Sequence, residues 1–185
     1  MKGRLILLFS GPVAAGKSTL STTLVENYGY KSIHSGRYLQ MLAQDRALDV
    51  SRRTLQMLGD GLDDVTDFAW LVDDVAAPLI EGEPDQKLWL LDSVRKARQV
   101  EHFRARFRDD VLHVHVVAPE EELRRRYEER LRKGGEYEGG TPYDEAISHP
   151  NEVSSRALGT IADLIVDASA PGAIDRILVI AHTRI

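Results

Sequence analysis

The sequence predicts an α/β fold with a five-stranded, mostly parallel sheet and helices on both of its faces. Two observations support this fold class. Five short apolar runs alternate with segments of helical pattern along the chain. The connection after the first run is glycine-containing, and two later runs end on Asp92 and Asp167. Alternating strands and helices usually form a covered parallel sheet, with ligands bound at the carboxyl ends of the strands.

The predicted elements follow one another without a repeat. The strands are expected at residues 5–9, 31–34, 88–91, 111–117 and 164–166, and the helices at 17–28, 36–47, 51–79, 97–107 and 119–133. His113 and His115 alternate with apolar residues on the fourth strand, and we interpret them as structural. Trp70 falls in the long third helix, where core packing is favoured over stacking on a ligand.

The connection after the first strand carries a phosphate-binding motif. Residues 11–18 are GPVAAGKS, which fits G-x-x-x-x-G-K-[ST] between a strand and a helix. Glycines let the backbone approach an anion, and the loop amides and helix N-terminus direct partial positive charge at it. Lys17 can reach the β- and γ-phosphates, and the hydroxyl of Ser18 suits Mg²⁺. The motif therefore predicts a P-loop that binds a nucleoside triphosphate.

Composition excludes several classes of function. The chain has 185 residues, a length that predicts a single domain spanning residues 1–185. It is 43% hydrophobic and has a net charge of −5. This acidic balance argues against a general nucleic-acid or membrane-surface role. Cysteine is absent, which excludes disulfides and fits a reducing compartment. No apolar run is long enough for a signal peptide or a membrane span, so we expect a cytoplasmic protein.

A P-loop alone does not specify a reaction, because kinases, GTPases, motors and transport ATPases share it. A GTPase needs N-K-x-D after a later strand, and the two asparagines, Asn27 and Asn151, lack that neighbourhood. Motors and transporters usually need larger chains with partner domains. A kinase of a small molecule fits the length best, and it needs a second anion site and positive charge around the transferred group.

Candidates for both requirements follow the third and fourth strands. Asp92 can hold Mg²⁺ through water or orient the acceptor, and Arg95 can bind phosphate through two parallel bonds. The alternative is an aspartate that caps a turn beside a solvated arginine. Five arginines lie on the helix after the fourth strand: Arg124, Arg125, Arg126, Arg130 and Arg132. Arg126 and Arg130 share a face, and we expect two or three of the five to contact the nucleotide.

Two further segments have a distinctive composition. Residues 134–142 form a glycine-rich loop directly after the arginine-rich helix, which favours a lid over residues 126–156, with a disordered surface loop as the alternative. Six aspartates between residues 60 and 74 are expected to form a solvated helical face. An acceptor-binding helical region is expected at about 35–85.

At these positions the chain resembles the nucleoside monophosphate kinase-like branch of the P-loop kinases, which includes adenylate kinase and dephospho-CoA kinase. The resemblance spans about residues 4 to 170. It begins with residues 9–19, FSGPVAAGKST, and with 34–37, HSGR, which is similar to an S-T-G-D segment. Residues 53–59, RTLQMLG, with 92–95, DSVR, are similar to patterns of phage-type deoxynucleoside monophosphate kinases. Pro119 followed by Arg126 and Arg130 matches the lid-edge arginines of adenylate kinases.

The resemblance implies residue roles, with ATP and Mg²⁺ as ligands. It implies that Lys17, Asp92, Arg126 and Arg130 are catalytic and that Ser18, with Asp92 through water, holds the metal. ATP would contact Gly11, Ala14, Ala15, Gly16, Lys17, Ser18, Thr19, Arg126, Ala168 and Ala170, with Arg126 stacked on adenine. The acceptor would contact Ser35, Arg37, Arg53, Gln56, Arg95 and Arg156.

Two departures make a plain adenylate kinase unexpected. The D-G-F-P-R segment of adenylate kinases is replaced by residues 92–95, and Gln40 stands where their helix carries an arginine, with Arg37 one turn earlier. We expect ATP-dependent phosphoryl transfer to a small phosphorylated acceptor, foremost a nucleoside or deoxynucleoside monophosphate. The alternatives are a kinase of dephospho-CoA or another small molecule, and a nucleotide-binding regulatory module with little turnover. The base, the sugar, the pathway and the choice between monomer and homodimer stay open.

Overall fold

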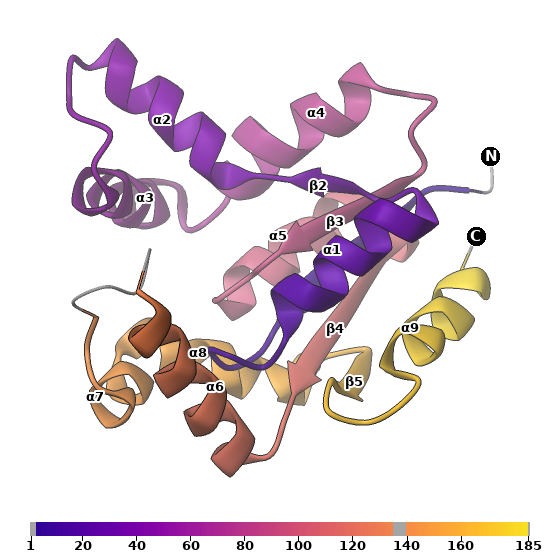
Figure 1. Cartoon of the computed structure of the whole chain (residues 1–185). Coiled ribbons are helices and arrows are strands. Elements are labelled where there is room, and N and C mark those ends of the chain that lie inside the picture. The colour runs from indigo at the N-terminus through magenta and orange to yellow at the C-terminus, as the bar shows by residue number, and fades with distance from the viewer. Residues whose placement is uncertain (1–2, 135–139, 185) are drawn as a thin grey trace.

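A computed structural model describes residues 3–134 and 140–184 of the chain (Figure 1). It confirms the predicted α/β class, because its five strands form one all-parallel sheet in the order β2-β3-β1-β4-β5. The strands are β1 (Leu5–Ser10), β2 (Lys31–Ile33), β3 (Leu88–Asp92), β4 (Val111–Val117) and β5 (Leu164–Asp167). Among the described residues, no helix combines the length and apolar character needed to cross a membrane.

The central strand β1 explains why the sheet needs helices on both faces. All six of its residues are buried. Leu5, Leu7 and Phe9 face one hydrophobic core, whereas Ile6 and Leu8 face the other. Successive side chains of a strand point to opposite faces, so an unbroken apolar run is what a strand between two cores requires.

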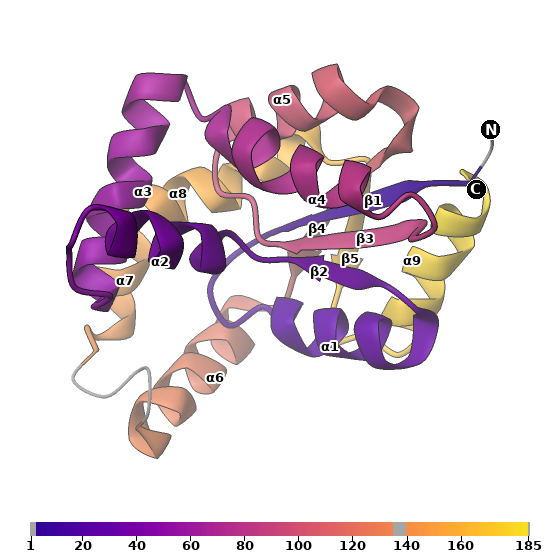
Figure 2. The same ribbon diagram turned by 90° about the horizontal axis from the view of Figure 1, so that it is seen from above.

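The two helical layers lie on opposite faces of this sheet (Figure 2). The core around Leu5 and Phe9 receives α1 (Lys17–Tyr28), α6 (Glu120–Lys133), α7 (Tyr143–Ser148) and α9 (Ala173–His182). The core around Ile6 receives the π-helix η1 (Leu71–Ala76), α4 (Ala77–Gly82), α5 (Ala97–Phe107) and the 3-10 helix η4 (Leu158–Ile161). A further 3-10 helix, η2 (Arg108–Asp110), leads into β4.

The remaining helices gather at the carboxyl ends of the strands. The α2 (Ser35–Asp45) and α3 (Arg52–Thr66) helices lie on one side of the P-loop, while α6, α7 and α8 (Pro150–Ala157) lie on the other (Figures 1 and 2). Gly59 of α3 packs close to Leu39 of α2, since a Cβ at Gly59 would lie 3.6 Å from Leu39 Cδ1. The P-loop therefore lies between two groups of helices.

The prediction of one helix over residues 51–79 was wrong. The α3 helix ends at Thr66 because Asp67 and Phe68 both take left-handed backbone, with φ of 51° and 66°. Such residues terminate α-helical hydrogen bonding. The chain then continues as η1 and α4. Trp70, directly before η1, is buried in the core around Ile6, as core packing predicts. The helices α7, α8 and α9 were not predicted, because two of them are short and follow polar segments.

Three buried polar side chains lie below the P-loop. Ser10 Oγ is 2.7 Å from Nε2 of His113 and 2.8 Å from Nδ1 of His115. Burial lowers the pKa of His113 to about 4, and burial together with the charge of Lys17 lowers the pKa of His115. Both imidazoles are therefore neutral at pH 7, and the hydroxyl joins them. This arrangement agrees with the structural role predicted for the two histidines.

Candidate phosphate-binding site

The P-loop conformation requires glycine at its first position. Gly11 has a φ of 130°, and a Cβ there would lie 2.0 Å from the carbonyl oxygen of Val116 on β4. Gly16 has a φ of 99°, and a Cβ there would lie 3.2 Å from Ala168 Cβ. Between them Ala14 also has left-handed backbone, with a φ of 63°. The loop is therefore pressed against β4 and against the segment that follows β5, where only small residues fit.

Lys17 begins α1 and bends back over the first half of the loop. Its Nζ donates hydrogen bonds to the carbonyl oxygens of Gly11, at 2.8 Å, and Pro12, at 2.7 Å. Burial lowers the pKa of Lys17 to about 8, with opposing effects from two carboxylates, Asp92 and Glu152, and further lowering by Arg95 and Arg130. The ammonium thus lies where charges from both sides of the loop meet, and it remains mostly protonated at pH 7.

Asp92 ends β3 beside the first turns of α1. Its Oδ2 accepts a hydrogen bond of 3.0 Å from Ser21 Oγ. Ser18, Ser21 and Asp92 line one cavity of about 380 Å³, together with Thr22, Val25, Glu26, Ser32, Ile33 and His34. Within residues 3–134 and 140–184, no cluster of three acidic, histidine or cysteine side chains could hold a metal ion. The hydroxyl and carboxylate oxygens nonetheless fit Mg²⁺, which is usually bound through one or two carboxylates, water and substrate phosphate.

Arg126 of α6 connects the P-loop to the turn after β5. Its Nε donates to Glu122 at 2.6 Å, its Nη1 to the Ala15 carbonyl at 3.4 Å, and its Nη2 to Ser169 Oγ at 3.3 Å. Gly16 and Ala168 lie next to this guanidinium. The structure therefore brings together Arg126, the end of the P-loop and the start of segment 168–170, whereas their roles toward ATP stay predictions. Ser18, Thr19 and Ala170 are exposed nearby.

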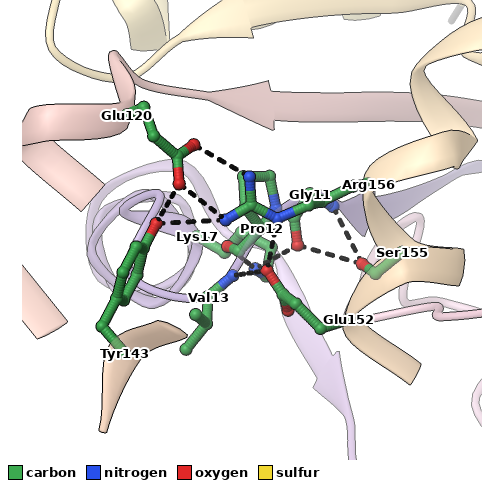
Figure 3. Close-up of polar contacts among 9 residues, drawn as sticks. All are labelled: Gly11, Pro12, Val13, Lys17, Glu120, Tyr143, Glu152, Ser155 and Arg156. Carbon is green, nitrogen blue, oxygen red and sulfur yellow. Dashed lines mark hydrogen bonds and ion pairs between the residues drawn. The ribbon is translucent and has the colours of Figure 1, made fainter. Parts of the chain in front are cut away.

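The α8 helix docks on the opposite end of the P-loop (Figure 3). Ser155 Oγ donates to the Gly11 carbonyl at 3.0 Å and accepts from the Gly11 amide at 3.4 Å. Glu152 Oε1 accepts from the Val13 amide at 2.9 Å. The same Oε1 accepts from Arg156 Nε at 3.0 Å. Both Glu152 and Ser155 thus contact the phosphate-binding backbone directly.

Arg156 is held by three further contacts on the α6–α8 side (Figure 3). Its Nη1 donates to Glu120 Oε2 at 2.9 Å, and its Nη2 donates to Glu120 Oε1 at 3.4 Å and to the hydroxyl of Tyr143 at 3.1 Å. That hydroxyl donates to Glu120 Oε1 at 2.6 Å. Although burial disfavours the charge, the hydrogen bonds that Arg156 donates to Glu120, Tyr143 and Glu152 raise its pKa. The predicted acceptor contact by Arg156 therefore starts from a side chain that already has protein partners.

The other predicted acceptor residues lie on the far side of the P-loop. Ser35 and Arg37 are in the first turn of α2, Arg53 and Gln56 are on α3, and Arg95 follows β3. The three arginines are exposed, and none forms an ion pair with another described side chain. Arg95 lies close enough to Lys17 to lower its pKa, as Arg130 does from α6. Convergence of all these residues on one ligand stays a prediction.

Sequence reasoning missed Glu152, Ser155 and Ser21. A signal for Glu152 was present, because it precedes Arg156 by four residues in a helix whose first residue, Pro150, is favoured in a first turn. Ser21 follows Lys17 by four residues and so shares its helix face. The central part of the predicted lid, residues 135–139, lies outside the described residues.

Comparisons with known proteins agree with the fold. The profile of a family described as AAA domain matches residues 10–140, well over half of the chain. No match was found among curated proteins. The solved structures that are similar include a sugar kinase from Janibacter sp. HTCC2649, unliganded, with 14% identity, 96% of this chain and 93% of that chain covered, and a TM-score of 0.55.

Two other solved structures have comparable similarity. TT1252 from Thermus thermophilus has 18% identity, with 98% of both chains covered and a TM-score of 0.57. An uncharacterized protein from Eubacterium ventriosum ATCC 27560 has 12% identity, with 98% of this chain and 100% of that chain covered and a TM-score of 0.56. At such identities these structures establish a shared fold alone.

Proposed function

The chain belongs to the AAA domain family, and from this premise we propose that it is a P-loop kinase that transfers the γ-phosphoryl group of ATP to a small phosphorylated acceptor. One observation carries the proposal. Lys17 lies within the electrostatic influence of Arg95 on one side and Arg130 on the other. Phosphoryl transfer depends on positive charge placed around the transferred group.

The donor half of the proposed site is the P-loop. Its amides and Lys17 would hold the phosphates of ATP, and Arg126 would hold the base against the segment beginning at Ala168. When bound, Mg²⁺ would neutralise charge on the phosphate oxygens, and Ser18 and the carboxylate of Asp92, through water, would hold it. Arg130 would contact the transferred phosphate, and Asp92 would also be placed to orient the acceptor.

The acceptor half is proposed to bind a nucleoside or deoxynucleoside monophosphate. The support is the likeness of residues 53–59 and 92–95 to monophosphate kinase patterns, together with the exposed guanidinium groups of Arg37, Arg53 and Arg95. An arginine without an acidic partner offers its full charge and both donor edges to a phosphate. Closure of the α6–α8 region over the P-loop would exclude water and so favour transfer over hydrolysis.

A second acceptor class has its own support. The cavity beside Asp92 is lined by hydroxyls, His34, two carboxylates and two aliphatic side chains, and none of the described residues that line it is a lysine or an arginine. Such a lining suits a neutral, hydroxyl-rich molecule better than an anionic one, and one solved structure with a similar fold is a sugar kinase. A kinase of a neutral sugar is therefore an alternative to be tested, beside the kinase of dephospho-CoA that the sequence left open.

A coupled assay of ADP release separates these possibilities. The full chain with Mg²⁺ and ATP is supplied with each common ribo- and deoxyribonucleoside monophosphate, then dephospho-CoA, then a set of neutral sugars. We expect ADP release above the no-acceptor blank with at least one monophosphate. Release with a sugar alone would replace the acceptor class. If none of the acceptors causes ADP release above the blank but ATP binding is measurable, the chain would instead be a regulatory nucleotide-binding module.

A further inference from the structure

The carboxylate of Glu152 accepts a hydrogen bond from one of the backbone amides of the P-loop. P-loop amides bind phosphate oxygens because they point partial positive charge into the loop. One of them, the Val13 amide, instead donates to Glu152 Oε1 at 2.9 Å (Figure 3). The side chain of Glu152 is only 13% exposed, and its second partner is Arg156. An anion supplied by the protein thus lies on the backbone that is built to receive a phosphate.

The position of Lys17 indicates which phosphate this anion would oppose. In P-loops the lysine reaches the β- and γ-phosphates, so a group beside its ammonium lies toward the end of the phosphate chain. Here the ammonium lies on the carbonyl oxygens of Gly11 and Pro12, directly before Val13 in the chain. The charge of Glu152 also raises the pKa of Lys17, so the two groups are close. Glu152 therefore lies on the side of the loop where a terminal phosphate would be bound.

We propose that Glu152 determines how strongly the site distinguishes nucleoside triphosphates from diphosphates, by competing with the terminal phosphate for the Val13 amide and for Lys17. A triphosphate must displace the carboxylate, whereas a diphosphate, which lacks the third phosphate, leaves it in place. Arg156 makes the displacement feasible, because it already contacts Glu152 and keeps that charge paired when the amide is lost. This inference rests on the nucleotide-binding half of the proposed function and is independent of the acceptor.

The proposal predicts opposite behaviour for two nucleotides. Glu152→Gln removes the negative charge but leaves an amide oxygen that can accept from Val13. The Kd of a Mg²⁺-bound, non-hydrolysable ATP analogue should fall about tenfold, which corresponds to about 1.4 kcal/mol. The Kd of ADP should change less than twofold. Both values are measured by calorimetry on the full chain without acceptor, after thermal unfolding has shown that the variant is folded.

Two more variants complete the test. Glu145→Gln removes the same charge from an exposed position on α7 and should change neither Kd. Glu152→Asp keeps the charge on a side chain one methylene shorter, and it should also tighten triphosphate binding, by a smaller factor. The proposal is overturned if Glu152→Gln weakens or does not change triphosphate binding, or if both nucleotides tighten equally. If the wild-type chain binds neither nucleotide, both this proposal and the proposed function are overturned. If it binds nucleotides but shows no acceptor-dependent ADP release, only the proposed function is overturned.

Discussion

On the α6–α8 side of the P-loop, Arg126 and Arg156 each contact a glutamate, whereas on the α2–α3 side Arg37 and Arg53 form no ion pair with a described side chain. The space around the backbone glycines differs in the same way, being tighter at the P-loop than in α2. Gly11, pressed against β4, has no room for a side chain, while Gly36 in the first turn of α2 has nothing within 4 Å of a Cβ position.

This difference separates a preorganised half from an adaptable half. A paired arginine has already lost part of its conformational freedom, so it can orient a ligand with little further ordering. An unpaired, exposed arginine keeps its freedom and loses it only when a ligand is bound, which lowers affinity but tolerates ligands of different shape. The donor nucleotide is therefore expected to be bound by fixed groups and the acceptor by groups that become ordered around it.

The largest expected effect comes from comparing one added methyl group in each region, at Gly11 of the P-loop and at Gly36 of α2. Gly11→Ala should destabilise the fold by at least about 3 kcal/mol, because its Cβ would overlap the Val116 carbonyl and its φ of 130° is unfavourable for alanine. Gly36→Ala should stabilise it slightly, by up to about 1 kcal/mol, since alanine favours a helix over glycine. Urea unfolding measures both. Similar free energies of unfolding for the two variants would remove the distinction between the halves.

Acid should lower the free energy of unfolding through His113, which is buried below the P-loop. Burial lowers the pKa of His113 to about 4, from 6.5 in an unfolded chain, so protonation favours the unfolded state. The stabilisation is complete above pH 6.5 and is lost as the pH falls toward 4. Between pH 7 and pH 5 the free energy of unfolding should fall by about 2 kcal/mol. His113→Asn should flatten this slope, and His34→Gln, at an exposed position, should not.

Removal of the ammonium at the centre of the site should affect turnover next. Under the proposed function, Lys17→Ala should lower kcat at least about tenfold, a loss of about 1.4 kcal/mol of transition-state stabilisation, because the ammonium proposed to bind the β- and γ-phosphates is removed. The coupled ADP assay measures it, with thermal unfolding as the control for folding. Unchanged turnover would contradict the assignment of Lys17 and would leave the two halves without a common centre.

The smallest effect should distinguish the two sets of arginines. Arg95→Gln should raise the KM of the acceptor about fivefold and leave the KM of ATP within twofold, since one charged hydrogen bond contributes on the order of 1 kcal/mol at an exposed site. Arg126→Gln should raise the KM of ATP about fivefold and leave the KM of the acceptor within twofold. Steady-state kinetics with both substrates varied gives all four values. Parallel changes in the two variants would mean that donor and acceptor groups are not separated as proposed.

Predictability from the sequence follows how local the determining pattern is, and not the division between the two sides of the P-loop. The P-loop, β1 and α1 were predicted because each depends on a local pattern: an apolar run, a glycine spacing and a helical face. The end of α3 was not, because Asp67 is one of six aspartates in the segment and Phe68 is not a residue type that signals left-handed backbone. Glu152 was missed for a related reason, since its contact with Val13 joins residues 139 positions apart. Contacts of that separation arise from the packing of α8 against the loop and leave little trace in a local pattern.

The docking of Ser155 on Gly11 has a consequence for the motion of the loop. One hydroxyl satisfies both the amide and the carbonyl of that glycine, so α8 completes the main-chain hydrogen bonding where β1 ends. The Gly11 amide can exchange its proton with solvent only when α8 leaves. Its exchange rate should therefore report the opening of a helix about 140 residues away in the chain, and not the opening of the sheet beside it.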